Sequence, residues 1–503
     1  MRTPLSILSV VSGLVLSSVN LEAQVRIVYA NNDQFTVNTV SAFSADANGV
    51  LTEISGSPFA TGGGGTGGGA FAVNRITLAG GKFLYASDGG TNDIGAFSID
   101  PSAGTLTPVP NAPFSAGAGG GFGDISLAAS PDGHFLFAGL ASNATIVTFA
   151  INADGSLSLV KGIPVSVAPF GMKVSPDGKF LAAALPALGG VGGVAMYSIA
   201  ADGTLAMVTG SPYFDGGSGN LSGVDINCAG NTLFGAEMTQ GTNIVDVFSI
   251  ASGGGLSAIQ GSPFSVGSGL NSNVGVLSPN DQLLFVSNQI SNSITVLNVA
   301  AGGALSLAGA SPVPLGGSGS NPAGMATDQS GTQLYVAANP NLIYVFNVAT
   351  DGTLSAAVGS PFSTNQQAGL LSLAAFPAKT CAVGPPPPPP APPVISGLPA
   401  AGSCTLWSPS GLLVQVATVA ASSSASTLAS FNVTGTSNEP PDPAVQDIVI
   451  TGTGLAPRVV QLRANRLGSG TGRVYTLTAT AIDVAGNTTT ATSMCTVPHD
   501  QGN

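Results

Sequence analysis

The chain is poor in charge and in histidine. Only 7% of its 503 residues are charged, with 12 Lys and Arg against 24 Asp and Glu, and it has two histidines, His134 and His499. A net charge of -12 without a basic cluster argues against binding to nucleic-acid phosphates, so we expect no nucleic-acid partner. Two histidines and no Cys-x-x-Cys pair make a Ser-His-Asp triad and a structural zinc site unfavourable interpretations.

Long hydrophobic runs are missing after the N-terminus. Arg2, the apolar residues 5–19 and the small residue Ala23 are typical of a secretory signal peptide, which we assign to residues 1–23. The apolar run is shorter than the roughly 20 residues that span a bilayer, so we expect no transmembrane segment. The mature chain is therefore predicted to be exported, as a secreted, periplasmic or cell-surface protein.

A short proline phrase recurs through the first 360 residues. Successive prolines lie 48 to 55 residues apart, and each phrase closes a unit of about four strand-like runs separated by Asp-Gly or Gly-Gly turns. This period is typical of a β-propeller, in which each repeat forms one blade. The phrases are Ser57-Pro58-Phe59, Ala112-Pro113-Phe114, Ile163-Pro164-Val165, Ser211-Pro212-Tyr213, Ser262-Pro263-Phe264, Ser311-Pro312-Val313 and Ser360-Pro361-Phe362.

The two ends of the repeat region are each incomplete. Residues 25–30 match the second strand of a unit and have no inner strand before them, whereas residues 370–376 match an inner strand without a unit of their own. The last segment is therefore predicted to complete the first blade and to close the ring. The fold class is all-β: a monomeric seven-bladed β-propeller at residues 24–380, followed by an Ig-like β-sandwich.

A proline-rich linker precedes the second domain. Prolines 385–390, 392 and 393 favour a stiff polyproline II spacer within a linker at residues 381–394. Residues 395–503 then show about seven short alternating strands, which indicate a β-sandwich. The segments 403–407, 436–441 and 481–488 resemble the Ig-like domains that end many exported bacterial proteins. This resemblance implies an adhesive or spacing module.

Four cysteines fall in a setting that permits disulfides. Cys404 and Cys495 open and close the second domain, so we predict that they pair, because a bridge between first and last strands staples a small sandwich. Cys228 occupies a blade turn and Cys381 follows the closing strand. The sequence leaves open whether these two pair.

The repeats carry a family likeness. Residues 284–288, 294–298 and 175–181 resemble the seven-bladed propellers of the lactonase family, which includes 6-phosphogluconolactonase-like and carboxymuconate-cyclase-like proteins and grades into YVTN-repeat proteins. The resemblance implies a site for carboxylate- or phosphate-bearing lactones, made by a His, a Glu and several Arg at the channel mouth. Here His134 falls in a hairpin turn and Glu237 follows an outer run, so that set cannot be carried over, and enzymatic activity stays open.

Five polar residues are predicted to lie near the propeller axis, where they are candidates for a ligand-binding channel. For the charged members, pairing between blades is the favoured interpretation and ligand binding the alternative. Asp124 and Asp225 would be the carboxylates available to a divalent cation, although we expect no cofactor. The candidates are Asn74, Arg75, Asp124, Lys173 and Asp225.

Three functions remain in view. The leading hypothesis is a non-catalytic propeller that binds a carbohydrate, a peptide or a cell-surface ligand. The first alternative is a lactonase-like hydrolase or cyclase in which a bound metal replaces the missing histidine. The second alternative is a structural spacer of the envelope or matrix.

Overall fold

The chain divides into two compact units, Met1–Ala382 and Val383–Asn503. The computed structural model describes residues 25–68, 72–117, 121, 123–188, 191–214, 220–238, 243–268, 271–316, 321–366, 372–379, 381, 393–423, 428–483 and 488–500. The predicted signal peptide and residues 382–392 of the predicted linker lie outside these residues. All regular elements in the described ranges are β-strands. These ranges contain no helix long and apolar enough to cross a membrane.

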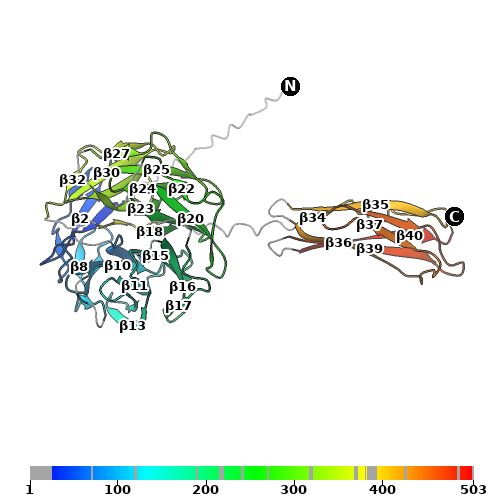
Figure 1. Cartoon of the computed structure of the whole chain (residues 1–503), viewed down its shortest axis with the longest axis horizontal. Helices are drawn as coiled ribbons and strands as arrows, with labels where there is room; N and C mark the ends of the chain where they lie inside the picture. Colours follow the sequence, from blue (N-terminus) through cyan, green and yellow to red (C-terminus); the bar gives the residue numbers. More distant parts are fainter. Residues whose placement is uncertain are drawn as a thin grey trace, which may run out of the picture. The chain divides into compact units, whose positions relative to one another are not determined.

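The first unit contains seven antiparallel sheets, and Figure 1 shows their inner strands β10, β18 and β23 near the centre and the outer strands β8, β13, β17 and β32 at the rim. Blade 1 consists of β33 (Ser372–Phe376), β1 (Ile27–Asn31), β2 (Thr39–Ala45), β3 (Leu51–Glu53) and β4 (Phe59–Ala60). Blade 2 consists of β5 (Ile76–Ala79), β6 (Phe83–Asp88), β7 (Asp93–Ile99), β8 (Leu106–Pro108) and β9 (Phe114–Ser115). Blade 3 consists of β10 (Ile125–Ala129), β11 (Phe135–Leu140), β12 (Thr145–Ile151) and β13 (Leu157–Pro164).

The remaining four blades repeat this order from the axis outward. Blade 4 consists of β14 (Gly171–Val174), β15 (Phe180–Leu188), β16 (Val191–Ile199) and β17 (Leu205–Met207). Blade 5 consists of β18 (Leu221–Ile226), β19 (Thr232–Glu237), β20 (Ile244–Ile250), β21 (Leu256–Ala258) and β22 (Phe264–Ser265). Blade 6 consists of β23 (Ser272–Leu277), β24 (Leu283–Asn288), β25 (Ser293–Val299), β26 (Leu305–Leu307) and β27 (Val313–Pro314). Blade 7 consists of β28 (Pro322–Thr327), β29 (Gln333–Ala338), β30 (Leu342–Val348), β31 (Leu354–Ala356) and β32 (Phe362–Ser363).

The ring closes as the sequence predicts. β33, from the end of the unit, pairs antiparallel with β1, from its start, with Tyr29 opposite Ala374. The innermost strands contact one another in cyclic order, β5, β10, β14, β18, β23, β28, β33 and back to β5. Blade 1 is thus assembled from both ends of the repeat region, which leaves the ring without a gap.

The serine of the proline phrase has a structural task in five blades. Its hydroxyl accepts a hydrogen bond from a backbone N–H of the third strand, as Ser262 Oγ does from Val247 N at 2.9 Å and Ser311 Oγ from Val296 N at 2.7 Å. Each hydroxyl thereby satisfies a donor of that strand just where the outer strand ends. The same bond is made by Ser57, Ser211 and Ser360.

Apolar clusters between successive blades form the core, and buried tyrosines fasten them at one end. Tyr29 Oη of blade 1 donates to the carbonyl of Gly104 in blade 2 at 2.8 Å, and Tyr85 Oη of blade 2 donates to Gly155 in blade 3 at 2.8 Å. Both tyrosines are fully buried, so these bonds replace the water that each hydroxyl loses on folding.

The second unit is a sandwich of two antiparallel sheets around one apolar core. One sheet has the order β34 (Val394–Ser396), β35 (Leu413–Ser422), β38 (Arg458–Arg463) and β37 (Ile448–Thr451). The other has the order β36 (Leu428–Ser437), β39 (Gly472–Asp483) and β40 (Thr488–Pro498). The predicted disulfide Cys404–Cys495 is present. This strand order is typical of constant-type immunoglobulin sandwiches, and the Ig-like assignment itself stays a prediction.

Candidate functional site

The propeller has two ends with different chemistry, which we name by residues at each. Within a blade, inner strands begin and second strands end at the same end, since neighbouring strands are antiparallel. Arg75 directly precedes the inner strand β5, and Cys228 follows the inner strand β18, so they lie at opposite ends. We call these the Arg75 end and the Cys228 end.

A buried ion-pair cluster occupies the Arg75 end. Arg75 Nη1 lies 2.7 Å from Asp33 Oδ2, and Arg75 Nη2 lies 2.8 Å from Asp124 Oδ1. Arg75 is only 1% exposed, and it joins the loop after β1 to the segments before β5 and β10. Burial raises the pKa of Asp124, although the nearby guanidinium opposes this effect. The three side chains therefore tie blades 1, 2 and 3 together.

Backbone and hydroxyl donors complete the coordination of these carboxylates. Asp33 Oδ2 also accepts from Thr66 Oγ1 at 2.7 Å, and Asp124 Oδ2 accepts from Ala72 N at 2.8 Å. The two carboxylates that pair with Arg75 are thus held in place by donors of the fold. Arg75 therefore acts as a structural cation within the cluster.

Asp88, at the end of β6, is a second buried carboxylate of this end. Its Oδ1 accepts hydrogen bonds from Asn38 Nδ2 and Thr61 Oγ1, both at 2.8 Å. Burial raises the pKa of Asp88 to about 7, and the charges of Asp93 and Asp33 act in the same direction. This group therefore changes its charge near neutral pH.

Residues just before β5 fill the axis at the Arg75 end. Val73 N donates to Phe170 O of blade 4 at 2.9 Å, and Val73 O accepts from Ser372 Oγ of blade 1 at 2.8 Å. The side chain of Val73 is 6% exposed and belongs to one apolar cluster with Val274 and Met325 of blades 6 and 7. Partners on so many blades place Val73 at the axis.

The small residues of the inner strands reflect this crowding. A Cβ added to Gly171 would lie 2.6 Å from Ser222 O and 2.8 Å from Val73 Cγ2. Asn74, next to Val73, accepts a hydrogen bond from Leu127 N through its carbonyl oxygen at 2.6 Å. The backbone of Asn74 therefore links the segment before β5 in blade 2 to β10 in blade 3.

At the Cys228 end, Lys173 of β14 and Asp225 of β18 form an ion pair of 2.9 Å. Burial alone would raise the pKa of Asp225, but the ammonium groups of Lys173 and Lys379 and the N–H of Leu277 outweigh it, and the pKa is lowered. Asp225 is consequently ionised, and the positive charges of Lys173 and Lys379 balance its negative charge. Lys173 keeps 42% of its side chain exposed, so this pair is the more accessible of the two charged groups.

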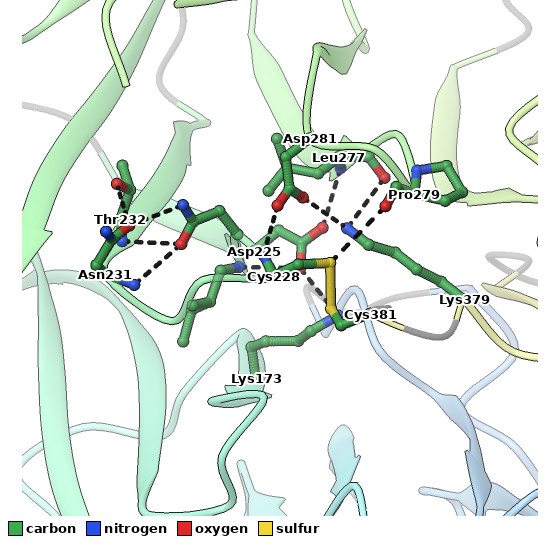
Figure 2. The surroundings of a disulfide bond; sticks show 12 residues. Lys173, Asp225, Cys228, Asn231, Thr232, Leu277, Pro279, Asp281, Lys379 and Cys381 are labelled. Atoms are coloured by element: carbon green, nitrogen blue, oxygen red, sulfur yellow. Dashed lines mark hydrogen bonds and ion pairs between the residues drawn. A yellow bond between two sulfur atoms is a disulfide. The ribbon is translucent and has the colours of Figure 1, made fainter. Parts of the chain in front are cut away.

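A covalent strap crosses to this end from blade 1. The described residues 377–379 and Cys381 follow β33, and the disulfide Cys228–Cys381 attaches this strap to the turn after β18 in blade 5. Figure 2 shows Lys379 of the strap pointing toward Asp281, with Nζ 3.4 Å from Asp281 Oδ1, while Cys228 N donates to the other oxygen of Asp281 at 2.6 Å. The strap therefore joins blades 1, 5 and 6.

The predicted candidates separate into two groups. Arg75 and Asp124 meet at one end, and Lys173 and Asp225 meet at the other, each in an ion pair between blades. Among the residues that the structure describes, no group of three or more His, Cys, Asp or Glu side chains forms a metal site. His134 is exposed in its turn and pairs with Asp132 at 2.9 Å.

Sequence reasoning did not identify Asp33, Asp88 or Lys379 as members of these clusters. Asp33 and Asp88 both end or follow a second strand, where each blade turns back at the Arg75 end. The repeat gives no common signal for them, because alignment on the buried Tyr29 and Tyr85 places Asp88 opposite Asn32 and leaves Asp33 one position further along. Lys379 follows the repeats and has no counterpart in the other blades.

Exposed apolar side chains project from loops at the Arg75 end. Phe35 and Val37, between β1 and β2, are 63% and 56% exposed. Ile290 in the β24–β25 turn and Phe214 after blade 4 are 50% and 51% exposed. Exposed apolar side chains in loops are one feature of interaction surfaces.

Comparisons with known proteins agree with this architecture. A sequence model of the family described as "Lactonase, 7-bladed beta-propeller" matches residues 242–365, which include strands β20 to β32. A proposed 6-phosphogluconolactonase from Bacteroides fragilis superposes with a TM-score of 0.54 at 17% identity, covering 71% of this chain and 99% of that one. A proposed 6-phosphogluconolactonase from Bacteroides uniformis gives 0.54 at 16% identity, covering 70% and 100%. No curated protein matches the sequence significantly.

The first unit is thus a seven-bladed β-propeller. Residues 242–365 match the sequence model of the lactonase propeller family, and the fold is similar to that of the two solved structures. At such low sequence identity, similarity to the solved structures shows the fold alone. The function has to be argued from this chain's own residues.

Proposed function

We propose that the protein is an exported, lactonase-type propeller that acts as a non-catalytic binding module, with the loops of the Arg75 end as its binding surface. The ligand class is a carbohydrate, a peptide or a cell-surface component. Two disulfides within the described residues support export, since such bonds persist in oxidising compartments.

The observation that carries the proposal is the environment of Arg75. A lactone with a carboxylate or phosphate needs an accessible cation, ideally an Arg that can bind it in a bidentate manner. The propeller sequence has two arginines; Arg75 is 1% exposed between Asp33 and Asp124, and Arg26 pairs with Asp328 at 3.1 Å. Both guanidinium groups are already neutralised by carboxylates of the fold.

The binding surface is argued from the exposed apolar loops. Side chains such as Phe35 and Val37 lose contact with water only when a partner covers them, which favours association. The buried ion-pair cluster of Arg75 fixes the loop after β1, because Asp33 in that loop accepts hydrogen bonds from Arg75 and Thr66. A rigid loop loses little entropy on binding.

The test is a binding screen of the intact mature chain on glycan and peptide arrays and on intact bacterial cells. We expect saturable binding that the double variant Phe35→Ser, Val37→Ser weakens by at least about tenfold. The matched control is Leu159→Ser, since Leu159 is 64% exposed on the outer strand β13. Binding that is equally strong in all three proteins would exclude this surface, and no saturable binding at all would support the structural spacer.

The family match favours one second candidate, a lactonase-like hydrolase. A metal ion would then have to lower the pKa of a bound water, because His134 lies in an exposed turn. Elemental analysis together with lactone turnover before and after chelation separates the two functions. Metal-dependent turnover would establish the hydrolase and overturn the binding module.

A further inference from the structure

The second unit has a groove where its first strand leaves the sheet. β34 pairs with residues 420–422 of β35 and with no other part of it. At Gly397 the backbone has a φ of 83°, and a Cβ there would collide with the carbonyl oxygen of Thr418, so a residue without a side chain is needed at this bend. The chain then turns away from β35.

The departing segment crosses to the other sheet and is fixed there. Cys404 is bonded to Cys495 of β40, Leu406 N donates to Thr496 O at 2.8 Å, and Thr496 N donates to Cys404 O at 2.9 Å. Leu406 is 4% exposed in the core. Residues 403–408 therefore form a rigid wall opposite the first half of β35.

Between this wall and β35 lies a groove of about 510 Å³. Trp407, the single tryptophan of the chain, lines it and is 46% exposed, and Val414, Gln415 and Val416 of β35 form the opposite side. None of the described residues that line the groove is charged, and Ser403 and Ser408 supply hydroxyl groups. The groove suits an uncharged occupant.

The edge of β35 determines what kind of occupant fits. Among the described strands, residues 413–417 of β35 pair on one side only, with β38. Leu413 and Val414 on this edge are 36% and 41% exposed. An exposed apolar edge with free backbone donors and acceptors is a template for an added strand.

We propose that this groove binds an uncharged, extended peptide segment of a partner protein, which adds to β35 as a strand along residues 413–417. Five residues at about 3.3 Å each give a ladder of roughly 16 Å, longer than the three-residue pairing of β34. Trp407 packs against an apolar side chain of that segment. The proposal concerns the second unit alone and does not depend on the function proposed for the propeller.

A second copy of this domain fits less well than a single chain. In a pair of sandwiches joined by their β35 edges, each would bring its own residues 403–408 against the wall of the other. A single extended segment meets no such obstacle. A neutral sugar could stack on Trp407, but it would leave the free backbone groups of residues 413–417 unpaired, so it is the occupant that the experiment has to exclude.

The experiment uses the full mature chain and a displayed library of linear ten-residue peptides. We expect enriched peptides to be uncharged with apolar residues at alternate positions, and to slow amide exchange in residues 413–417 when added as synthetic peptides. Val414→Lys and Trp407→Ala should each weaken binding at least about tenfold. The control Leu455→Lys, in a loop where Leu455 is 48% exposed, should bind as the parent does.

The sandwich transition in calorimetry shows that each variant is folded, and the Phe35→Ser, Val37→Ser variant of the propeller should bind the peptides normally. Three results would overturn the proposal: no enriched peptide that distinguishes the parent from Val414→Lys, binding without protection of residues 413–417, or an array of neutral oligosaccharides that binds through Trp407 without that protection.

Discussion

Arg75 and Asp33, which come from different blades, form an ion pair of 2.7 Å in which both side chains are 1% exposed. The second contact of the guanidinium, with Asp124, extends this link to a third blade. The charge of Arg75 thus holds three blades in place, because a buried cation is retained only where carboxylates neutralise it.

Arg75→Met should destabilise the propeller by about 3 to 5 kcal/mol, because it leaves Asp33 and Asp124 buried without their cation. The free energy of unfolding is measured by denaturant titration, with the loss of β-structure followed by far-UV circular dichroism. Lys179→Met is the control: its pair with Asp177 at 3.0 Å is largely exposed, so stability should hardly change. Equal effects of the two substitutions would mean that the Arg75 cluster does not hold the blades.

The propeller should lose stability as the pH rises from about 4 to about 7. The pKa of Asp88 is raised to about 7 in the folded state by burial, whereas an unfolded aspartate has its usual value near 3.9. The folded state therefore binds the additional proton within this window, and unfolding becomes easier as that proton is lost.

Asp88→Asn should remove that dependence. Compared with the parent, the variant should gain stability on the order of 3 kcal/mol between pH 4.5 and pH 8, because the asparagine carries no charge to desolvate. Unfolding curves of both proteins at several pH values give the difference. Parallel curves across this range would show that Asp88 titrates in the same way in both states.

The Cys404–Cys495 bridge should stabilise the second unit. It joins residues 91 apart, and the chain-entropy relation gives about 4.6 kcal/mol for a loop of this size. Calorimetry of Cys404→Ser should show a lower melting temperature for the sandwich and an unchanged propeller transition. A shift of the propeller transition instead would contradict the independence of the two units.

The Cys228–Cys381 bridge should stabilise the propeller and leave the second unit unaffected. It fastens the segment that follows β33 to blade 5, next to the pair of Lys379 and Asp281. Cys381→Ser should lower the melting temperature of the propeller alone, since the segment after the closing strand is then no longer attached to blade 5. Each cysteine variant serves as the control for the other, and an unchanged propeller transition in Cys381→Ser would show that the strap adds nothing to ring closure.

Much of the fold could be predicted from the sequence because its signals are periodic. The proline phrase fixed the number of blades, and the missing inner strand at residue 25 predicted the partner of β1 correctly. The disulfide of the second domain followed from the positions of Cys404 and Cys495 alone. A repeating sequence pattern predicts the strands and turns of each unit, and these determine the fold of a repeat protein.

The clusters at the two ends could not be predicted in the same way. Arg75 meets Asp33 across 42 residues, and Lys379 meets Asp281 across 98, in loops whose sequences do not repeat. Val73 fills the axis through contacts with several blades at once. Such contacts depend on the packing of the whole ring, which no local pattern encodes.

The most direct test of the central claim is lactone hydrolysis by the purified mature chain. The substrates are neutral, carboxylated and phosphorylated lactones, assayed with and without added divalent metal and after chelation. We predict rates equal to the uncatalysed background in every condition, because both propeller arginines are paired with carboxylates of the fold. Sustained turnover of any of these lactones that follows the protein through purification would contradict this account.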